Sequence, residues 1–292
     1  MASPRRPIHW TPPRTTERRR QRPYNAYTMD FLWDLSLLGY VTIDQASWMY
    51  GAPRSTTVLN LRHWRYRGLI QAAWVTYHGQ RTRIVALAPG GADLLRDEDE
   101  KGWELLHPQW EPVSERVRTE RMVEHNLDRN TAALMLKRKA EELGLSASWD
   151  LWMTDLIVPG NPPLRIKPDA ALTINGHPVL IELERSWRAR TLLRKIAQYD
   201  RVVLQGGWRE IPWCQEPPKV LLIPTSANTQ KKNLQAWMTT FQFHQHSYAW
   251  VWPWPYVEAG RFTVYGGDGD PVVQARDLWA MMRQPAYRER RS

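Results

Sequence analysis

The chain has 292 residues, 42% of them hydrophobic and 24% charged, which is typical of a globular protein large enough for two cores. The 40 Lys and Arg against 30 Asp and Glu give a formal net charge of +10, which favours nucleic acid as partner over a membrane surface. The single cysteine, Cys214, excludes an internal disulfide and cysteine-rich zinc modules. No apolar run reaches the roughly 20 residues that span a bilayer. No signal-peptide pattern opens the chain, so we expect a cytoplasmic protein that does not contact membranes.

Residues 1–23 are dominated by Pro, Arg and Thr and contain almost no aliphatic side chains. Such a segment buries too little apolar surface to offset the entropy of ordering it, so we expect a basic disordered arm. The arm is either a solvated tail or a source of phosphate contacts, which need charge but no fixed shape.

Residues 24–96 contain regular helix and turn signals. Thr42 is placed to cap one helix, and Ser55 or Thr56 is placed to cap the next. The predicted elements are a helix from Tyr27 to Leu38, a short helix from Ile43 to Tyr50, a helix from about Ser55 to Arg67, a hairpin around His78-Gly79-Gln80 and a helix from about Gly91 to Arg96.

Helix, short helix, helix and β-hairpin is the order of a winged helix-turn-helix, whose third helix enters the DNA major groove and whose hairpin is the wing. Val58, Leu61 and Trp64 are expected to face inward. The residues expected to contact DNA are Arg54, Ser55, Thr56, Thr57, Asn60 and His63 on the helix and Arg81 and Arg83 on the wing. The alternative is a winged helix that pairs with another protein.

Residues 97–113 begin with an acidic run and continue with Pro and Trp, and we expect them to be a linker. Residues 114–292 then form the second predicted domain. It opens with an amphipathic helix over residues 114–143 that carries Glu124, followed by a strand over residues 149–158. Further along, the pattern predicts a helix over 188–203, a strand over 219–224, a helix over 229–239 and a strand over 248–252. This order indicates an α/β (α+β) fold with a mixed sheet.

The most informative stretch of the second domain surrounds Asn175-Gly176, a strong hairpin signal between two apolar runs. Glu182 and Glu184 share one face of the second strand, because side chains alternate with a period of two. Asp169 lies at the start of the partner strand. Three converging carboxylates make an oxygen-rich site suited to Mg²⁺ or Mn²⁺, which can activate water and stabilise a phosphodiester transition state.

These residues carry a family resemblance. Pro168-Asp169, twelve intervening residues, Glu182-x-Glu184 and a following basic helix resemble the PD-(D/E)xK nuclease superfamily. With the predicted winged helix and the Lys195-x-x-x-Tyr199 motif, residues 27–260 resemble the replication-relaxation proteins of plasmids and other mobile elements.

The resemblance implies a restriction-endonuclease-like domain in which Asp169 and Glu182 are metal ligands. Glu184 stands where the superfamily usually has lysine, as in some restriction enzymes that use a second glutamate there. Lys195, or Lys167, would then supply the positive charge, and Glu124 would be an additional carboxylate.

The function expected on these grounds is binding of double-stranded DNA with Mg²⁺-dependent phosphodiester hydrolysis. One alternative is a non-catalytic replication accessory factor or regulator, in which basic residues satisfy the carboxylates as ion pairs. Another is a second domain that serves as a protein-interaction platform in a nucleoprotein complex. A homodimer is compatible with the pattern, since many winged-helix proteins read paired half-sites.

Overall fold

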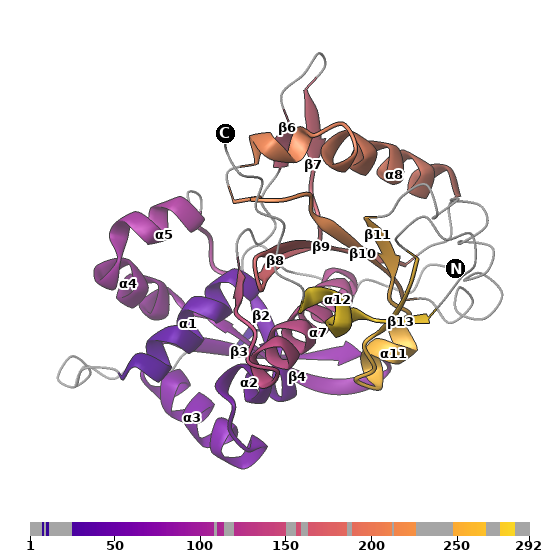
Figure 1. Ribbon diagram of the computed structural model, residues 1–292. Coiled ribbons are helices and arrows are strands. Elements are labelled where there is room, and N and C mark those ends of the chain that lie inside the picture. Colours follow the sequence, from indigo (N-terminus) through magenta and orange to yellow (C-terminus); the bar gives the residue numbers. More distant parts are fainter. Residues whose placement is uncertain are drawn as a thin grey trace. The chain divides into compact units, whose positions relative to one another are not determined.

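The computed structural model describes residues 8, 10–11, 25–107, 110–113, 120–149, 156–158, 163–185, 189–211, 213–225, 248–266 and 275–283. The fold is mixed α/β, with helices and mixed sheets (Figure 1). The chain divides into two units, residues 1–134 and residues 135–292. The division falls inside a long helix, whereas the sequence placed the linker at residues 97–113. The predicted helix at 229–239 lies outside the described residues.

The first unit combines helices with a four-stranded sheet in the order β1-β3-β4-β2, all pairs antiparallel. Its strands are β1 (Trp10–Thr11), β2 (Tyr40–Thr42), β3 (Ile70–Tyr77) and β4 (Gln80–Leu87). Its helices are α1 (Ala26–Leu38), α2 (Ile43–Tyr50), α3 (Arg54–Tyr66), α4 (Pro89–Glu98), α5 (Glu100–Leu106) and the first half of α7 (Glu120–Glu142).

Local sequence signals explain where the first two of these helices start and stop. The Asn25 side chain caps α1 by accepting from the Thr28 N–H at 2.9 Å, and Gly39 ends the helix at a φ of 79°. Thr42 and Gln45 form a reciprocal capping box at the start of α2, as the sequence predicts for Thr42.

Helix α3 begins one residue before the predicted caps. It starts at Arg54 after Pro53, and no side chain caps it, so the assignment of Ser55 or Thr56 as the cap is wrong. Pro53 occupies the N-cap position, and its ring has no oxygen that could accept from the first turn.

The predicted arm and linker both contain ordered structure. Ile8 is buried, and Trp10–Thr11 pair with Ala72 and Ala73 of β3, because the few apolar side chains of the arm find an apolar surface there. The rest of residues 1–23 lies outside the described residues. In the expected linker, Asp99 accepts from the Gly102 N–H at 3.0 Å and caps α5, which buries Trp103. The acidic run is therefore a helix boundary, and the linker prediction is wrong for residues 97–106.

Buried polar side chains fasten α7 to the rest of the first unit. Asn130 donates to the Tyr40 backbone oxygen at 2.7 Å, and Arg129 donates to that of Leu38 at 3.0 Å. Gln45 of α2 donates to the Leu127 backbone oxygen at 2.8 Å. These bonds explain why the first half of α7 belongs to this unit.

The second unit is built on a seven-stranded mixed sheet in the order β13-β12-β11-β10-β9-β8-β5. The central strands β9, β10 and β11 are parallel, and the remaining pairs are antiparallel. The strands are β5 (Ala147–Trp149), β8 (Ala170–Ile174), β9 (His177–Glu184), β10 (Lys219–Pro224), β11 (Ala249–Val251), β12 (Thr263–Gly266) and β13 (Ala275–Asp277). A separate two-stranded ribbon consists of β6 (Leu156–Val158) and β7 (Leu164–Ile166). The strand predicted over 149–158 has its two ends in β5 and β6, which belong to different sheets, and residues 150–155 lie outside the described residues.

Helix α8 (Ala189–Val203) packs along one face of this sheet (Figure 1). Leu192, Ile196 and Tyr199 of the helix join Leu180 of β9 and Leu222 of β10 in one apolar core. The other helical elements described in this unit are the second half of α7, η1 (Gly207–Glu210), α11 (Trp254–Glu258) and α12 (Leu278–Met282). Because Leu180 faces α8, Glu182, two residues further along the strand, faces it as well.

Candidate functional site

The exposed face of α3 carries most of the residues that the sequence assigns to DNA. Arg54, Ser55, Thr56 and His63 are exposed, and Asn60 is half-buried. Leu61 and Trp64 are buried on the opposite face, as predicted. The helix therefore presents a polar surface on one side and joins the core on the other.

Thr57 does not belong to that exposed face. Its side chain is 1% exposed, and its hydroxyl donates to the Pro53 backbone oxygen at 3.2 Å. The assignment of Thr57 to the DNA side is wrong, because this position turns toward the core together with Leu61 and Trp64, four and seven residues further along the helix.

Arg54 is paired on the surface. Its Nε lies 2.7 Å from Asp44 Oδ1, and both side chains are more than 60% exposed, at 64% and 63%. An exposed pair of this kind contributes about 0–1 kcal/mol, so the guanidinium can leave Asp44 for another anion at small cost.

The β3–β4 hairpin turns through His78-Gly79, both with positive φ, at 47° and 75°. One face of the hairpin is exposed near its tip. Trp74 is 51% exposed there, and the Arg81 guanidinium lies 4.9 Å from the centre of its ring. Arg83 pairs directly across from Trp74 in the sheet and is half-buried.

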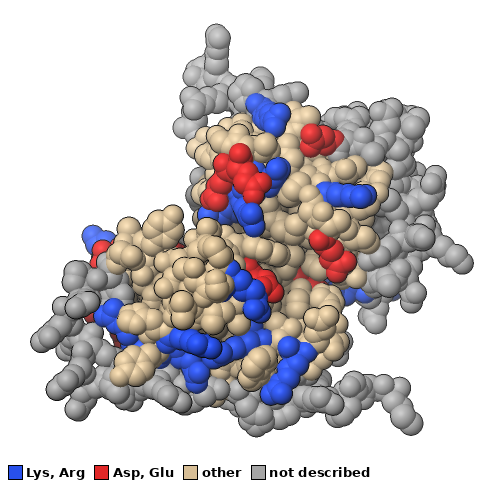
Figure 2. All heavy atoms as spheres, turned by 90° about the horizontal axis from the view of Figure 1, so that it is seen from below, with Lys and Arg blue, Asp and Glu red and all other residues tan. Residues whose placement is uncertain are grey.

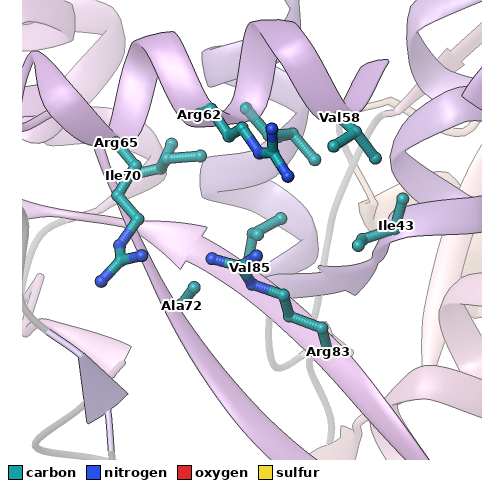
Figure 3. Close-up of a pocket in the computed structure, with 9 residues that line it drawn as sticks. Ile43, Val58, Arg62, Arg65, Ile70, Ala72, Arg83 and Val85 are labelled. Carbon is teal, nitrogen blue, oxygen red and sulfur yellow. The ribbon is translucent and has the colours of Figure 1, made fainter. Parts of the chain in front are cut away.

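Sequence reasoning missed Arg62 and Arg65 of α3. Together with Arg83 of β4 they line a small depression between the helix and the sheet (Figure 3). The sequence contains a signal for this. Arg62 and Arg65 follow Val58 by four and seven residues, and residues at these spacings share a helix face. On the face of the molecule seen in Figure 2, Lys and Arg side chains lie beside one another in a band.

The hairpin tip is held to α7 by Asp128, whose side chain is 1% exposed. One carboxylate oxygen, Oδ1, accepts from the Tyr77 hydroxyl at 2.9 Å and lies 2.9 Å from His78 Nε2. Burial and the charge of Asp128 raise the pKa of Tyr77 far above its ordinary value, so its hydroxyl keeps its proton and remains a donor. Glu124 lies here too, 3.9 Å from His78 Nδ1. Glu124 therefore contacts the hairpin turn of the first unit.

In the second unit the β8–β9 hairpin forms as predicted, with Asn175 and Gly176 at positive φ, 51° and 85°. Asp169 precedes β8, and its Oδ2 accepts from the Leu183 N–H at 2.8 Å. Glu182 and Glu184 of β9 both contact the Lys195 ammonium of α8, at 2.9 Å and 3.3 Å. The Tyr199 hydroxyl donates to Glu182 at 2.6 Å. We call Asp169, Glu182, Glu184, Lys195 and Tyr199 the carboxylate–lysine cluster.

Burial governs the electrostatics of this cluster. The Glu182 side chain is 5% exposed, and its burial raises the pKa of that carboxyl to about 7. Lys195 opposes the rise, and the negative charge of Asp169 adds to it. Burial alone would lower the pKa of Lys195, but the carboxylates of Glu182 and Glu184 raise it above its ordinary value. Lys195 is therefore a permanent cation between two carboxylates.

The cluster as arranged does not fit a metal ion. Within the described ranges no three His, Cys, Asp or Glu side chains converge in a way that could hold one. Lys195 contacts both glutamates, and one Asp169 oxygen is engaged by the backbone. Asp169, Glu182, Glu184 and Lys195 lie together, as the sequence predicts. The positive charge between the two glutamates is the Lys195 ammonium. Lys167, the other lysine considered, is exposed beside β7.

No protein-family model, curated protein or solved structure matches this chain. The resemblance to replication-relaxation proteins is carried by the motifs of the sequence alone. Among the described helices, none is both long and apolar enough to cross a membrane.

Proposed function

We propose that this chain binds double-stranded DNA through the first unit, with α3 in the major groove and the β3–β4 hairpin along the backbone. The observation that carries the proposal is the surface formed by α3 and the hairpin. The helix exposes Ser55, Thr56 and His63, while the hairpin beside it exposes Arg81 on Trp74. Polar side chains on a helix can read base edges, and arginine on a hairpin can hold phosphates.

The order of elements supports this proposal. The first unit runs α1, β2, α2, α3, β3, β4, and β2 pairs with β4 at the sheet edge. A winged helix-turn-helix has this order, with a short strand before the second helix and a hairpin after the third. The net charge of +10 adds long-range attraction to a polyanion.

A binding assay on labelled duplexes tests the proposal. Retention of a random duplex of about 20 base pairs, weakening steeply with salt, is the expected result, because neutralising several phosphates releases several counterions. Replacing Asn60 and His63 by Ala should reduce the preference among duplex sequences, whereas Lys101→Ala, at an exposed position of α5, is the control. Salt-independent retention, or none, would refute the proposal.

Phosphodiester hydrolysis by the second unit is the second candidate, of the kind seen in PD-(D/E)xK nucleases. It is favoured by the meeting of Asp169, Glu182 and Lys195 at the β8–β9 hairpin. It requires that Mg²⁺ or Mn²⁺ displace an ammonium from two carboxylates, which the arrangement does not favour. The test is to incubate the wild type and the Glu182→Gln variant with supercoiled plasmid in Mg²⁺, Mn²⁺ or EDTA. Metal-dependent nicking that the variant lacks would establish nuclease activity. Intact DNA in every lane would exclude hydrolysis under these conditions and leave DNA binding as the proposed function.

A further inference from the structure

Three arginines to which the described residues supply no acidic partner line one depression between α3 and β4. Arg62 and Arg65 extend from α3, and Arg83 extends from β4, into the same space (Figure 3). The floor of this space is apolar, formed by Ile70, Ala72 and Val85 of the sheet, with further apolar side chains from α2 and α3. Across the described ranges, no carboxylate pairs with any of the three guanidinium groups.

The arrangement is costly for the protein alone. Burial lowers the pKa of Arg83, and the positive charges of Arg65 and Arg62 lower it further. The Nε of Arg65 is buried and has no hydrogen-bond partner among the described residues. Like charges brought together on an apolar floor, with a buried donor left unused, are stabilised by an anion that enters the space between them.

We infer that Arg62, Arg65 and Arg83 form a site for one phosphate group, held jointly from the helix and the hairpin. A phosphate offers several acceptor oxygens to the planar fork of each guanidinium, which suits arginine better than lysine. This inference rests on the proposed function and deepens it, since the phosphate is a backbone phosphodiester of bound DNA. The site would fix how far α3 sits from the strand that the hairpin follows.

The chemistry also fits a free phosphate, so the test has two arms. In the first arm, the affinity of the full chain for a labelled duplex is measured against KCl concentration. The proteins are the wild type, each single Arg→Gln variant at positions 62, 65 and 83, and the triple variant. Arg96→Gln, which removes the same charge from α4, is the control.

If the three arginines share one phosphate, each single variant loses affinity on the order of tenfold, uniformly across duplex sequences. The slope of log affinity against log salt then falls by about one in the triple variant, because one phosphate is no longer neutralised. A fall of about three would mean three separate phosphates and would overturn the shared site. An unchanged slope would remove the cluster from DNA binding altogether.

In the second arm, thermal unfolding is followed in inorganic phosphate and in chloride at equal ionic strength. Phosphate should raise the unfolding temperature of the wild type more than that of the triple variant. The comparison with the variant corrects for the general stabilising effect of phosphate salts. Because removing like charges relieves repulsion, the variants should unfold no earlier than the wild type in chloride. Equal stabilisation of both proteins by phosphate would refute the anion site.

The two arms separate the failures. If phosphate stabilises only the wild type while the triple variant binds DNA unchanged, the site takes a free phosphate and the DNA assignment is wrong. If the wild type does not bind duplex DNA, the proposed function fails, and the second arm still decides whether the arginines bind phosphate.

Discussion

Replacing Lys195 by Met should destabilise the second unit in a way that depends on pH. The Nζ of Lys195 lies 2.9 Å from Glu182 Oε2, and Glu182 is almost fully buried. Two unit charges at that separation attract by about 6 kcal/mol at an effective dielectric constant of about 20, before the desolvation that opposes it. Removing one partner of a buried pair costs roughly 3–5 kcal/mol. Because Lys195 is still 28% exposed, we expect the lower end, about 3 kcal/mol at pH 8.

The sign of the pH effect follows from Glu182. Its pKa in the folded protein, about 7, lies above the ordinary 4.5, so its contribution is most favourable below pH 4.5 and falls as the pH rises to 7. Without Lys195 this pKa rises further, and the carboxyl of the variant is protonated at pH 5. The loss at pH 5 should therefore shrink to about 1 kcal/mol, because only the packing of the lysine stem and the contact with Glu184 are then lost.

Urea unfolding followed by tryptophan fluorescence at pH 5 and pH 8 measures this difference. Arg194→Met, which removes an exposed charge from the same helix, is the control and should change the unfolding free energy by less than about 0.5 kcal/mol. Adding Glu182→Gln to Lys195→Met should restore most of the loss at pH 8, because the more deeply buried of the two glutamate charges is then removed. Equal losses at both pH values, or a loss no larger than that of the control, would refute the ion-pair reasoning.

Three further predictions concern the first unit. Gly91→Ala should lower the free energy of unfolding by more than about 2 kcal/mol, because the alanine Cβ would lie 2.3 Å from the Leu69 backbone oxygen. An unchanged melting temperature would contradict that close approach. Thr42→Ala should cost about 1 kcal/mol by removing the capping box of α2, and Thr42→Ser, which keeps the hydroxyl, should cost less, so equal losses would exclude the cap as the cause. Asp128→Ala should release the hairpin tip, seen as faster amide hydrogen exchange at Thr76–Arg81 with little change in α1; protection that stays the same would mean that Tyr77 and His78 do not depend on Asp128.

The features that sequence reasoning located correctly depend on a few neighbouring residues. Thr42 and Gln45 are three residues apart, and their reciprocal hydrogen bonds define the start of α2 wherever the helix packs. The Asn175-Gly176 turn and the shared face of Glu182 and Glu184 follow from positive φ and from the period of a strand. The mixed α/β class follows from the order of such elements.

The errors occurred where a residue's environment is supplied by distant parts of the chain. With Val58, Leu61 and Trp64 expected to face inward, the pattern predicts Thr57 on the DNA side, yet Thr57 is buried with Leu61 and Trp64. The acidic run at 97–100 predicts a linker, yet Asp99 caps a helix whose Trp103 is buried. Trp10 pairs with a strand more than 60 residues away, at Ala73.

By itself, the sequence determined most of the local elements, the basic character of the protein and the group of acidic residues around the β8–β9 hairpin. Only the tertiary structure decided which charges meet. Lys195 reaches Glu182 and Glu184 because α8 packs across β9, and Arg62 and Arg65 reach Arg83 because α3 packs beside β4. Helix caps and turns are governed by interactions over three or four residues, whereas the partner of a charge depends on how whole helices pack onto sheets, and that is set by the burial of many apolar side chains together.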